Sequence, residues 1–375
     1  MTDLLELMTR AVAEQPPVTI TRESSIAAGR RAVRRRRTGL AALSVTGAAA
    51  LVATAIAVPR ALAPVSPPSN VVTYPVPQLP AAGVPGAIDR PDLVGSDPLL
   101  IHFGVASSAW PLSEVWYSSA NGTESVRAGA LQVMLGRSEA EPRRVAEGTG
   151  LSRSVTDPSH PNASPSPIAE RHTSQPTTVD GRSATLFSTT FADGTYPRYG
   201  LLWQPAAGLW LGISAETETG VAELWSDVDA LDLSRAYRVV VPFRLKSLPP
   251  GARVLDCTAG LPAAGEPLAA SFLTVGGPDG RAAISIGQPT VYPAGSTPAT
   301  HGPQPSLPAQ NRTVAGHSVF WTGGYFFSND WDGVPITVGV EDGYGEAEAT
   351  RILAGLQVSK NLTDPTTWPT SPTAG

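Results

Sequence analysis

"GLWLGISAETETGVAELWSDVDALDLS", residues 208–234, joins a strand pattern to a helical one and decides our expectation for the fold. Its first residues are apolar or small, whereas Leu224, Val228 and Leu231 recur at the spacing of one helix face. A second stretch, "GVPITVGVEDGYGEAEATRILAGLQVS" at 333–359, aligns with the first without a gap and shares seven identical residues. The pair predicts a strand followed by a helix at two places in the chain.

Further strands are indicated upstream of each unit. "TTVDGRSATLFS" (177–188) matches "RTVAGHSVFWTG" (312–323), and hairpin turns are expected at Asn121-Gly122 and around Asp279-Gly280. A strand, turn, strand and helix in each half would place one helix on one face of an antiparallel sheet. We therefore predict an α+β fold: one N-terminal transmembrane helix, then two tandem repeats of antiparallel sheet with a C-terminal helix each.

The composition restricts the kinds of site that the chain can hold. Of its 375 residues only Lys246 and Lys360 are lysine, so arginine supplies nearly all the positive charge. The single cysteine, Cys257, excludes an intramolecular disulfide and a cysteine-cluster metal site. Cys257 stands among apolar and small residues, which favours a quiet core position.

The N-terminal charge pattern predicts one crossing of a membrane. Residues 1–37 carry eight arginines and four acidic residues, about +4, so the remainder of this chain of net charge -5 carries about -9. Residues 38–58 contain no charged, amide or proline residue, and as a helix they would rise about 31 Å, the thickness of a bilayer core. Arginines on one flank hold that flank in the cytoplasm. The topology-determining arginines are Arg30, Arg31, Arg34, Arg35, Arg36 and Arg37.

A signal peptide cleaved after Ala61-Leu62-Ala63 is the alternative to an uncleaved anchor. The long region before the apolar run, the length of that run and Pro64 just after the site favour the uncleaved signal-anchor. Nucleic-acid binding by the arginines is not expected, because no aromatic residues are interleaved with them. The predicted layout is a basic cytoplasmic segment (1–37), a transmembrane helix (38–58), a proline-rich stalk (59–96), repeat 1 (97–241), repeat 2 (242–360) and a disordered tail (361–375).

The aromatic stretch "GHSVFWTGGYFFSNDWDG", residues 316–333, is the main candidate for a site. We interpret it as the inside of a β-hairpin, because aromatic residues suit a half-buried pleated surface. Two alternatives remain open. Trp321, Tyr325 and Trp331 could form a stacking platform for a sugar, and Asn329, Asp330 and Asp332 could supply oxygen ligands to calcium.

No catalytic motif is present in the sequence. It contains no G-x-S-x-G, no H-E-x-x-H, no phosphate-binding G-x-x-x-x-G-K and no G-x-G-x-x-G after a strand. The five histidines are scattered, and three of them lie in Pro- and Ser-rich segments. We expect no enzymatic activity, no cofactor and no resident metal.

The Arg-rich flank, Ala-rich span, Pro-rich stalk and the segment "PFRLKSLPPG" (242–251) resemble uncharacterised membrane-anchored envelope proteins of actinobacteria. The unit "VxG(R/H)S", strand, helix is similar to the extracytoplasmic sensor domains of bacterial anti-sigma and lipoprotein-sensing proteins. The His/Cys zinc motif of the anti-sigma cytoplasmic domain is absent, and no catalytic residues carry over.

Together these patterns predict a single-pass protein of the cell membrane whose bulk is extracytoplasmic. Its expected function is to bind or sense an unknown ligand, with a cell-envelope glycan or a membrane protein as the partner. The alternative is a structural or assembly partner of an envelope membrane complex that has no ligand of its own.

Overall fold

A computed structural model describes the protein over residues 71–112, 114–148, 154–155, 166–167, 170–192, 194, 196–217, 220–262, 270–287 and 310–373. The expected cytoplasmic segment over 1–37 with its topology-determining arginines, the membrane span over 38–58 and the cleavage site at 61–63 lie outside these residues. Within them, no helix combines the length and the apolar composition that crossing a bilayer requires.

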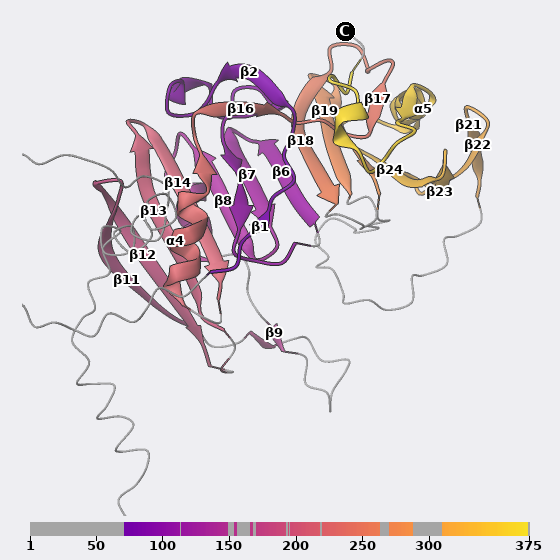
Figure 1. Ribbon diagram of the computed structural model, residues 1–375. Helices are drawn as coiled ribbons and strands as arrows, with labels where there is room; N and C mark the ends of the chain where they lie inside the picture. The colour runs from indigo at the N-terminus through magenta and orange to yellow at the C-terminus, as the bar shows by residue number, and fades with distance from the viewer. Residues whose placement is uncertain are drawn as a thin grey trace, which may run out of the picture.

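Fourteen of the described strands form one antiparallel sheet in the order β11-β12-β13-β14-β8-β7-β6-β18-β19-β20-β24-β23-β22-β21 (Figure 1). We call the strands on the β6 side the first half-sheet and those on the β18 side the second half-sheet. The first half-sheet consists of β6 (Glu114–Ala120), β7 (Thr123–Ala128), β8 (Leu131–Gly136), β11 (Glu170–Val179), β12 (Arg182–Phe191), β13 (Arg198–Ala206) and β14 (Leu209–Glu216). The second consists of β18 (Arg253–Pro262), β19 (Ser271–Gly277), β20 (Gly280–Ile286), β21 (Arg312–Val314), β22 (His317–Trp321), β23 (Tyr325–Trp331) and β24 (Val334–Glu341).

The two half-sheets meet where β6 pairs with β18, from Ser119 opposite Cys257 to Glu114 opposite Pro262. Moving outward from this seam, each half-sheet has three strands in chain order and then four in reverse chain order. The expected turn at Asn121 and Gly122 joins β6 to β7, and both residues have a positive φ, 51° and 78°. This is the backbone that a two-residue hairpin turn requires and that Asn-Gly adopts readily.

The predicted fold class, an N-terminal helix followed by two α+β repeats, is wrong. The described chain is mostly strand, with three α-helices in its described part, and one sheet runs through both halves. Sequence periodicity identifies strands, but it carries no signal for which strand edges pair. Pairing β6 with β18 satisfies the backbone groups of two edges that separate domains would leave open.

The two faces of the sheet differ in burial because successive side chains of a strand point to opposite sides. On the face that we call inner, Leu131, Val133 and Leu135 of β8 and Leu211 and Ile213 of β14 are fully buried. Their equivalents in the second half-sheet belong to the same apolar core, which continues across the seam. The opposite face is called outer below.

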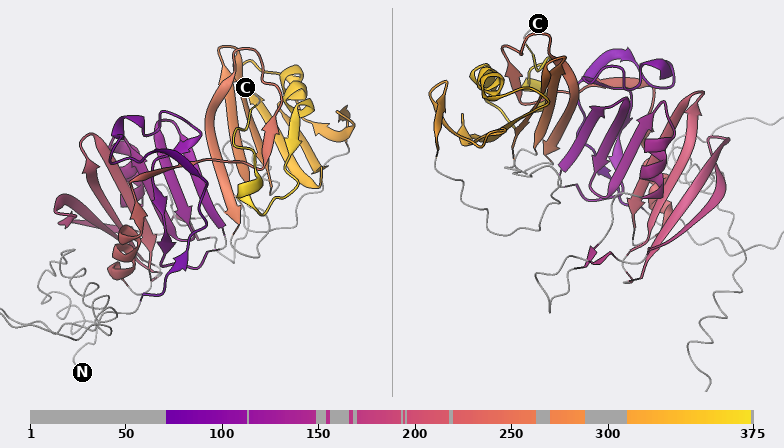
Figure 2. Two further views of the ribbon diagram at one scale, coloured as in Figure 1. Left: turned by 45° about the horizontal axis from the view of Figure 1, so that its top comes forward. Right: turned by 180° about the vertical axis from the view of Figure 1, so that it is seen from behind.

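The helices divide between these faces (Figure 2). α4 (Val221–Asp229) packs its Leu224 and Val228 into the inner core of the first half-sheet, and α5 (Glu346–Ala354) packs Ile352 and Leu353 into that of the second. α3 (Ala140–Glu147) lies on the outer face, against β8, β12, β13 and β14. The stretches expected to form helices in each unit therefore do so, on the inner side of the sheet.

Residues 71–96, expected to belong to the stalk, instead pack against the inner face. Val76, Leu79 and Val94 are buried, and the hydroxyl of Tyr117 donates a hydrogen bond to the Pro77 carbonyl over 2.7 Å. Apolar residues between the prolines give this segment enough surface to join the core. The elements of this region are β1 (Tyr74–Pro75), β2 (Ala81–Pro85), η2 (Pro91–Leu93), β3 (Leu100–Ile101), β4 (Gly104–Val105) and β5 (Ser107–Ser108).

The chain after Lys360, expected to be disordered, is packed as far as residue 373. Trp368 is 3% exposed, and its Nε1 donates to the Asn361 carbonyl over 3.0 Å. One large aromatic side chain buries enough apolar area to hold a polar tail in place. The remaining short elements are β9 (Ser154–Val155), β10 (Ser166–Pro167), β15 (Leu231–Asp232), β16 (Arg235–Arg238), β17 (Phe243–Leu245), β25 (Leu356–Val358) and η3 (Pro365–Thr367).

Candidate ligand-binding groove

The three residues of the predicted aromatic platform lie in the β22–β23 hairpin, but the structure does not bring them together on one surface. Trp331 is 1% exposed, and its ring stacks on His317 with centroids 4.1 Å apart. Trp321 packs inward against Phe326, with ring centroids 4.5 Å apart. Tyr325 precedes Phe326 on the same strand, so its side chain points to the other face. The stretch is the interior of a hairpin, as the first interpretation expected.

Tyr325 has a structural position on the outer face. A Cβ atom added to Gly339, its partner on β24, would come within 2.6 Å of the tyrosine ring. The ring therefore covers a place where the sheet has no side chain. Tyr325 also stacks with Phe327, with ring centroids 5.9 Å apart.

The calcium candidate at residues 329–332 forms a turn. Asp330 accepts a hydrogen bond from the Gly333 amide over 3.0 Å, and Asp332 adopts a left-handed φ of 53°. Asp332 also lies 3.8 Å from His317 Nε2. Among the residues that the structure describes, no three His, Cys, Asp or Glu side chains are grouped so as to hold a metal ion. Cys257 is fully buried on β18, and burial raises the pKa of its thiol.

A different candidate lies on the outer face, beside α3, which rests directly on two glycines. A Cβ added to Gly212 on β14 would lie 1.8 Å from the Pro142 carbonyl oxygen, and one on Gly200 of β13 would lie 2.0 Å from the Ala146 carbonyl oxygen. Any side chain at either position would push the helix off the sheet. The two glycines thus determine how close α3 comes to β13 and β14.

Arg198 holds the C-terminal end of α3. Its side chain is 4% exposed and donates to the Gly148 carbonyl over 2.8 Å and to Glu216 over 2.5 Å. The guanidinium also lies over the ring of Phe191, 5.6 Å from its centroid. A cation at the C-terminus of a helix is stabilised by the partial negative charge of the free carbonyls. α3 is therefore fixed at its C-terminal end.

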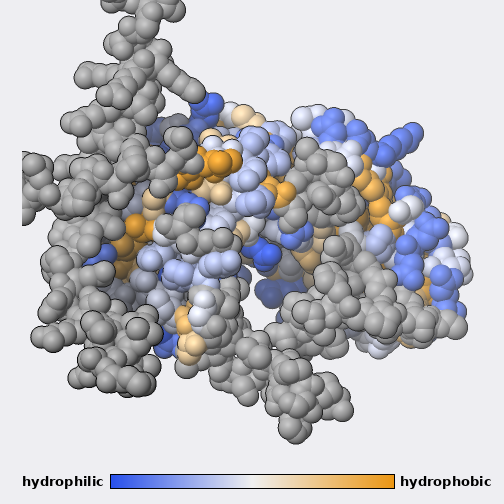
Figure 3. Space-filling model, turned by 60° about the horizontal axis from the view of Figure 1, so that its bottom comes forward, coloured by the Kyte–Doolittle hydropathy of each residue, from blue (hydrophilic) through white to orange (hydrophobic). Residues whose placement is uncertain are grey.

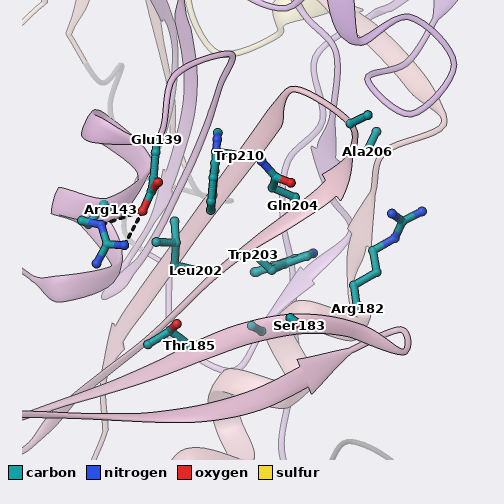
Figure 4. A pocket seen from close by; sticks show the side chains of 12 residues that line it. Glu139, Arg143, Arg182, Ser183, Thr185, Leu202, Trp203, Gln204, Ala206 and Trp210 are labelled. Atoms are coloured by element: carbon teal, nitrogen blue, oxygen red, sulfur yellow. Dashed lines mark hydrogen bonds and ion pairs between the residues drawn. The ribbon is translucent and has the colours of Figure 1, made fainter.

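The helix and the sheet enclose a groove of about 500 Å³ (Figure 4). Its floor is formed by outer-face positions of β12, β13 and β14, which include Thr185, Leu202, Gln204 and Trp210. Trp210 is half-buried, so part of its indole faces the open space. The described residues lining the groove are Glu139, Arg143, Arg182, Ser183, Ala184, Thr185, Leu202, Trp203, Gln204, Ala206, Ala207 and Trp210.

The helical side of the groove carries an ion pair. Arg143 Nε donates to Glu139 Oε1 over 2.8 Å, and Arg143 also contacts Glu147 one turn further on, over 3.2 Å. The hydrogen bond to Glu139 raises the pKa of Arg143 above its ordinary value. The guanidinium lies 6.0 Å from the centroid of the Phe187 ring. Arg143 is thus shared between two carboxylates and held in place by its neighbours.

Arg182 stands at the opposite end of the groove. It follows the Asp180-Gly181 turn between β11 and β12, whose two residues have positive φ angles of 51° and 75°. Its side chain is exposed, and within the described part of the chain it has no ion-pair partner. Among the described lining residues, Arg182 is therefore the charged side chain that forms no ion pair with another.

A second hollow of about 330 Å³ lies at the other end of α3. It is lined by Glu147, Phe187, Thr189 and three residues of β11, which are His172, Thr173 and Ser174. His172 Nδ1 lies 3.0 Å from the Thr189 hydroxyl, and its Nε2 lies 3.3 Å from Glu170. Because the polar groups of this hollow already bind one another, it offers fewer free partners to a ligand than the groove.

A buried carboxylate on the inner face, Glu124, has a structural role. It accepts hydrogen bonds from the backbone amides of Gly95 and His102 over 2.8 and 2.6 Å, and lies 2.7 Å from His102 Nδ1. Both side chains are fully buried. Glu124 therefore attaches the N-terminal segment to β7 and has no access to a substrate.

Asp227 on α4 is the second buried carboxylate of the inner face. It accepts hydrogen bonds from the Ala109 amide over 2.8 Å and from Trp110 Nε1 over 3.2 Å. Burial raises the pKa of Asp227 from 3.8 to about 7, against the lowering effect of these two hydrogen bonds. Asp227 thus connects α4 to the segment before β6 and titrates near neutral pH.

The sequence interpretation did not find the groove. α3 is only eight residues long and contains Pro142, so its helical periodicity is weak. Two features of the sequence indicate this helix. Glu139, Arg143 and Glu147 have the spacing of ion pairs along one helix face, and Gly148 is suited to the left-handed C-cap. The glycines at 200 and 212 indicate close approach only once the strands carrying them are known to be neighbours.

No protein-family model matches the chain, and no curated protein matches it either. Among solved structures it shows a weak similarity to MucB. A complex of Pseudomonas aeruginosa MucA and MucB has a TM-score of 0.20 and 13% identity, with 73% of this chain and 98% of that chain covered. A structure of MucB (TM-score 0.18, 17% identity) covers 66% of this chain and 93% of its own, and MucB bound to MucA(peri) (0.18, 14%) covers 73% and 98%. TM-scores this low support no argument about the fold or function of this chain.

Proposed function

We propose that this chain is a membrane-anchored extracytoplasmic binding protein without catalytic activity, and that the groove beside α3 receives its ligand. The observation that carries the proposal is the groove itself, where the half-buried indole of Trp210 adjoins Gln204, Thr185 and Ser183. Ligand sites in proteins are concave, have volumes of about 300–1,000 Å³ and combine aromatic surface with a few polar groups. The groove has these properties.

The chemistry of the lining favours binding over catalysis. The described lining residues include one carboxylate, Glu139, which is paired with Arg143, and they include no histidine, cysteine or aspartate. General acid–base catalysis needs a titratable group within reach of a substrate and with a pKa near the working pH. The carboxylate whose pKa lies near 7, Asp227, is buried on the other face of the sheet.

The extracytoplasmic location rests on charge and hydropathy. Arginines precede the apolar stretch 38–58, and the chain beyond residue 37 carries a net charge of about -9. In this arrangement residues 1–37 stay in the cytoplasm and the large sheet lies outside.

Binding is tested by co-sedimentation of the detergent-solubilised full chain with an isolated cell-envelope fraction. We expect the wild type to sediment and a Trp210→Ala variant to remain in the supernatant, because the variant loses the aromatic wall of the groove. Tyr74→Ala is the matched control, since Tyr74 is an exposed aromatic residue on β1, outside the groove. Equal sedimentation of wild type and Trp210→Ala would rule out the groove.

Location is tested by thiol labelling of intact cells. Cys257 is buried, so a cysteine introduced by Ala130→Cys at the exposed β7–β8 turn should dominate the reaction. We expect a membrane-impermeant maleimide to label this variant in intact cells. Labelling that requires cell lysis would contradict the proposed location.

A second candidate function, assembly with a membrane-protein partner, is favoured by aromatic residues on the outer face of the second half-sheet and its seam. Trp116 stacks with Phe272 at 5.8 Å between centroids, and Tyr325 stacks with Phe327. On the side shown in Figure 3, where the bottom of Figure 1 comes forward, hydrophobic groups of the described residues are separated by hydrophilic ones. Envelope binding that is lost in Phe272→Ala but kept in Trp210→Ala would support assembly instead.

A further inference from the structure

Resting on the binding function above, we propose that the groove takes an acidic saccharide, with a sugar ring against Trp210 and a carboxylate of the same saccharide against Arg182. The proposal follows from three properties of the described lining: an aromatic wall, a floor of polar side chains, and a cation at the rim, Arg182, that forms no ion pair with another lining residue.

The aromatic wall suits a sugar ring. One face of a pyranose presents several C–H groups, which pack on an indole, while its hydroxyls project around the edge of the ring. Trp210 is half-buried on β14, and Figure 4 shows its ring beside Gln204 in the groove. An indole held by its neighbours offers a large rigid surface at a low cost in conformational entropy.

The floor provides partners for hydroxyl groups. Gln204, Ser183 and Thr185 each carry a side chain that donates as well as accepts hydrogen bonds. Sugar hydroxyls have the same dual character, so each can be satisfied whichever way it points. The Glu139–Arg143 pair adds a fixed acceptor and fixed donors on the helical wall, which orients a ligand lying between helix and sheet.

The charge of the groove selects an acid. Glu139 and Arg143 neutralise each other, which leaves Arg182 as the net charge among the described lining residues. A guanidinium binds a carboxylate through two parallel hydrogen bonds and prefers it to a neutral hydroxyl. A uronic acid combines such a carboxylate with the ring face that Trp210 receives.

Two other ligand classes fit the groove less well. An aliphatic chain would bury Gln204, Ser183 and Thr185 without hydrogen-bond partners, which is costly. An extended peptide is recognised mainly by backbone hydrogen bonds at an open strand edge. The groove instead lies over the face of β12, β13 and β14, whose backbones pair with one another.

The test is isothermal titration of the full chain, in a detergent without a sugar headgroup, with trigalacturonate and separately with its methyl ester. The two ligands share their ring faces and differ in charge. We expect the acid to bind at least about tenfold more tightly than the ester, with a preference that shrinks as salt rises. Trp210→Ala should weaken both ligands, and Arg182→Ala should remove the preference while leaving the affinity for the ester unchanged. Arg244→Ala, at an exposed arginine of β17, should change neither.

The outcomes separate this inference from the proposed function. Equal binding of acid and ester would overturn the role of Arg182. If neither ligand binds while Trp210-dependent sedimentation with the envelope persists, the groove binds another class of ligand and the saccharide inference fails alone. If sedimentation is also absent, both fail. Near-UV circular dichroism of each variant shows whether a loss of binding reflects a loss of folding.

Discussion

The outer faces of the two half-sheets differ although their strands follow the same order. In the first half-sheet α3 lies on Gly200 and Gly212, and the groove opens beside it. In the second, within the described residues, no helix lies on the outer face, and the ring of Tyr325 covers Gly339. Glycines on a sheet face can thus admit a helix or be covered by an aromatic neighbour. The strand order alone does not decide whether the face forms a site.

The inner faces are more alike, but their helices differ in one buried charge. α4 and α5 both place apolar residues in the core, and only α4 of these two carries a buried carboxylate, Asp227. Because the seam between β6 and β18 joins the two half-sheets, we expect a destabilising substitution in one half-sheet to lower the stability of the other. The following predictions separate the roles of the two halves, beginning with the largest effect.

Trp331→Ala should have the largest effect on stability. The side chain is 1% exposed in the core of the second half-sheet, and truncating a buried aromatic residue costs about 3–5 kcal/mol. Because the sheet is continuous, we expect the variant to unfold in one transition, at a lower temperature than the wild type. Circular dichroism recorded at two wavelengths during heating measures this. Tyr74→Ala is the control. Two separate transitions would show that the half-sheets unfold independently.

Gly212→Ala should displace α3 and destroy the groove, which would make the outer face of the first half-sheet resemble that of the second. The added Cβ would lie 1.8 Å from a backbone oxygen, and overpacking of this kind costs up to about 3 kcal/mol. Gly324→Ala is the matched control, since its nearest contact would be 4.0 Å away. We expect a lower unfolding temperature and faster proteolysis near α3. Equal behaviour of the two variants would show that α3 is not held by close contact.

Asp227→Asn should change how stability depends on pH. The folded-state pKa of about 7 is above the ordinary 3.8, so the folded protein binds this proton more tightly than the unfolded chain does. The contribution of this carboxyl to stability should therefore be greatest below pH 4 and fall as pH rises to about 7, by roughly 2 kcal/mol between pH 5 and 7. In the asparagine variant the free energy of unfolding, measured by denaturant titration at several pH values, should not show this decrease. Asp229→Asn, at an exposed position of the same helix, should keep it.

Arg143→Ala should have the smallest effect. The side chain is 45% exposed, and its pairs with Glu139 and Glu147 are of the i, i+4 kind, so the loss in stability should stay below about 1 kcal/mol. Unfolding temperature, compared with Arg144→Ala on the same helix, measures it. A loss as large as that of Gly212→Ala would mean that the ion pairs, rather than the glycines, hold α3.

Several local elements could be predicted from the sequence. The helical stripes are present at 224–228 and 349–353, as are the Asn121-Gly122 turn and the hairpin at 316–333, because each depends on residues close in the chain. Leu231 and Leu356, expected at the ends of these stripes, lie instead on β15 and β25. The proline-rich segment 71–96 and the tail were misjudged. Composition predicts a solvated chain, but Val76, Leu79 and Trp368 find partners far away in the sequence.

The candidate site was less predictable than the strands. Trp331 and Trp210 are both tryptophans at strand positions, and nothing local shows that the first is buried and the second half-exposed. Arg182 and Glu139 are 43 positions apart in the sequence and line one groove only because α3, which Glu139 precedes, packs against β12, β13 and β14. Aromatic density drew the sequence interpretation to the hairpin, whereas the groove combines scattered residues.

The sequence by itself determined the strands of the two matched units, the Asn121-Gly122 turn and the apolar stripes of the two inner helices, since hydrophobic period and turn chemistry are properties of neighbouring residues. The tertiary structure decided that β6 pairs with β18, that α3 lies on Gly200 and Gly212, and that Trp210 and Arg182 share one groove. These features depend on edge pairing and on contacts between distant segments. Backbone groups at a strand edge are the same for every sequence, so only the folded chain selects their partners.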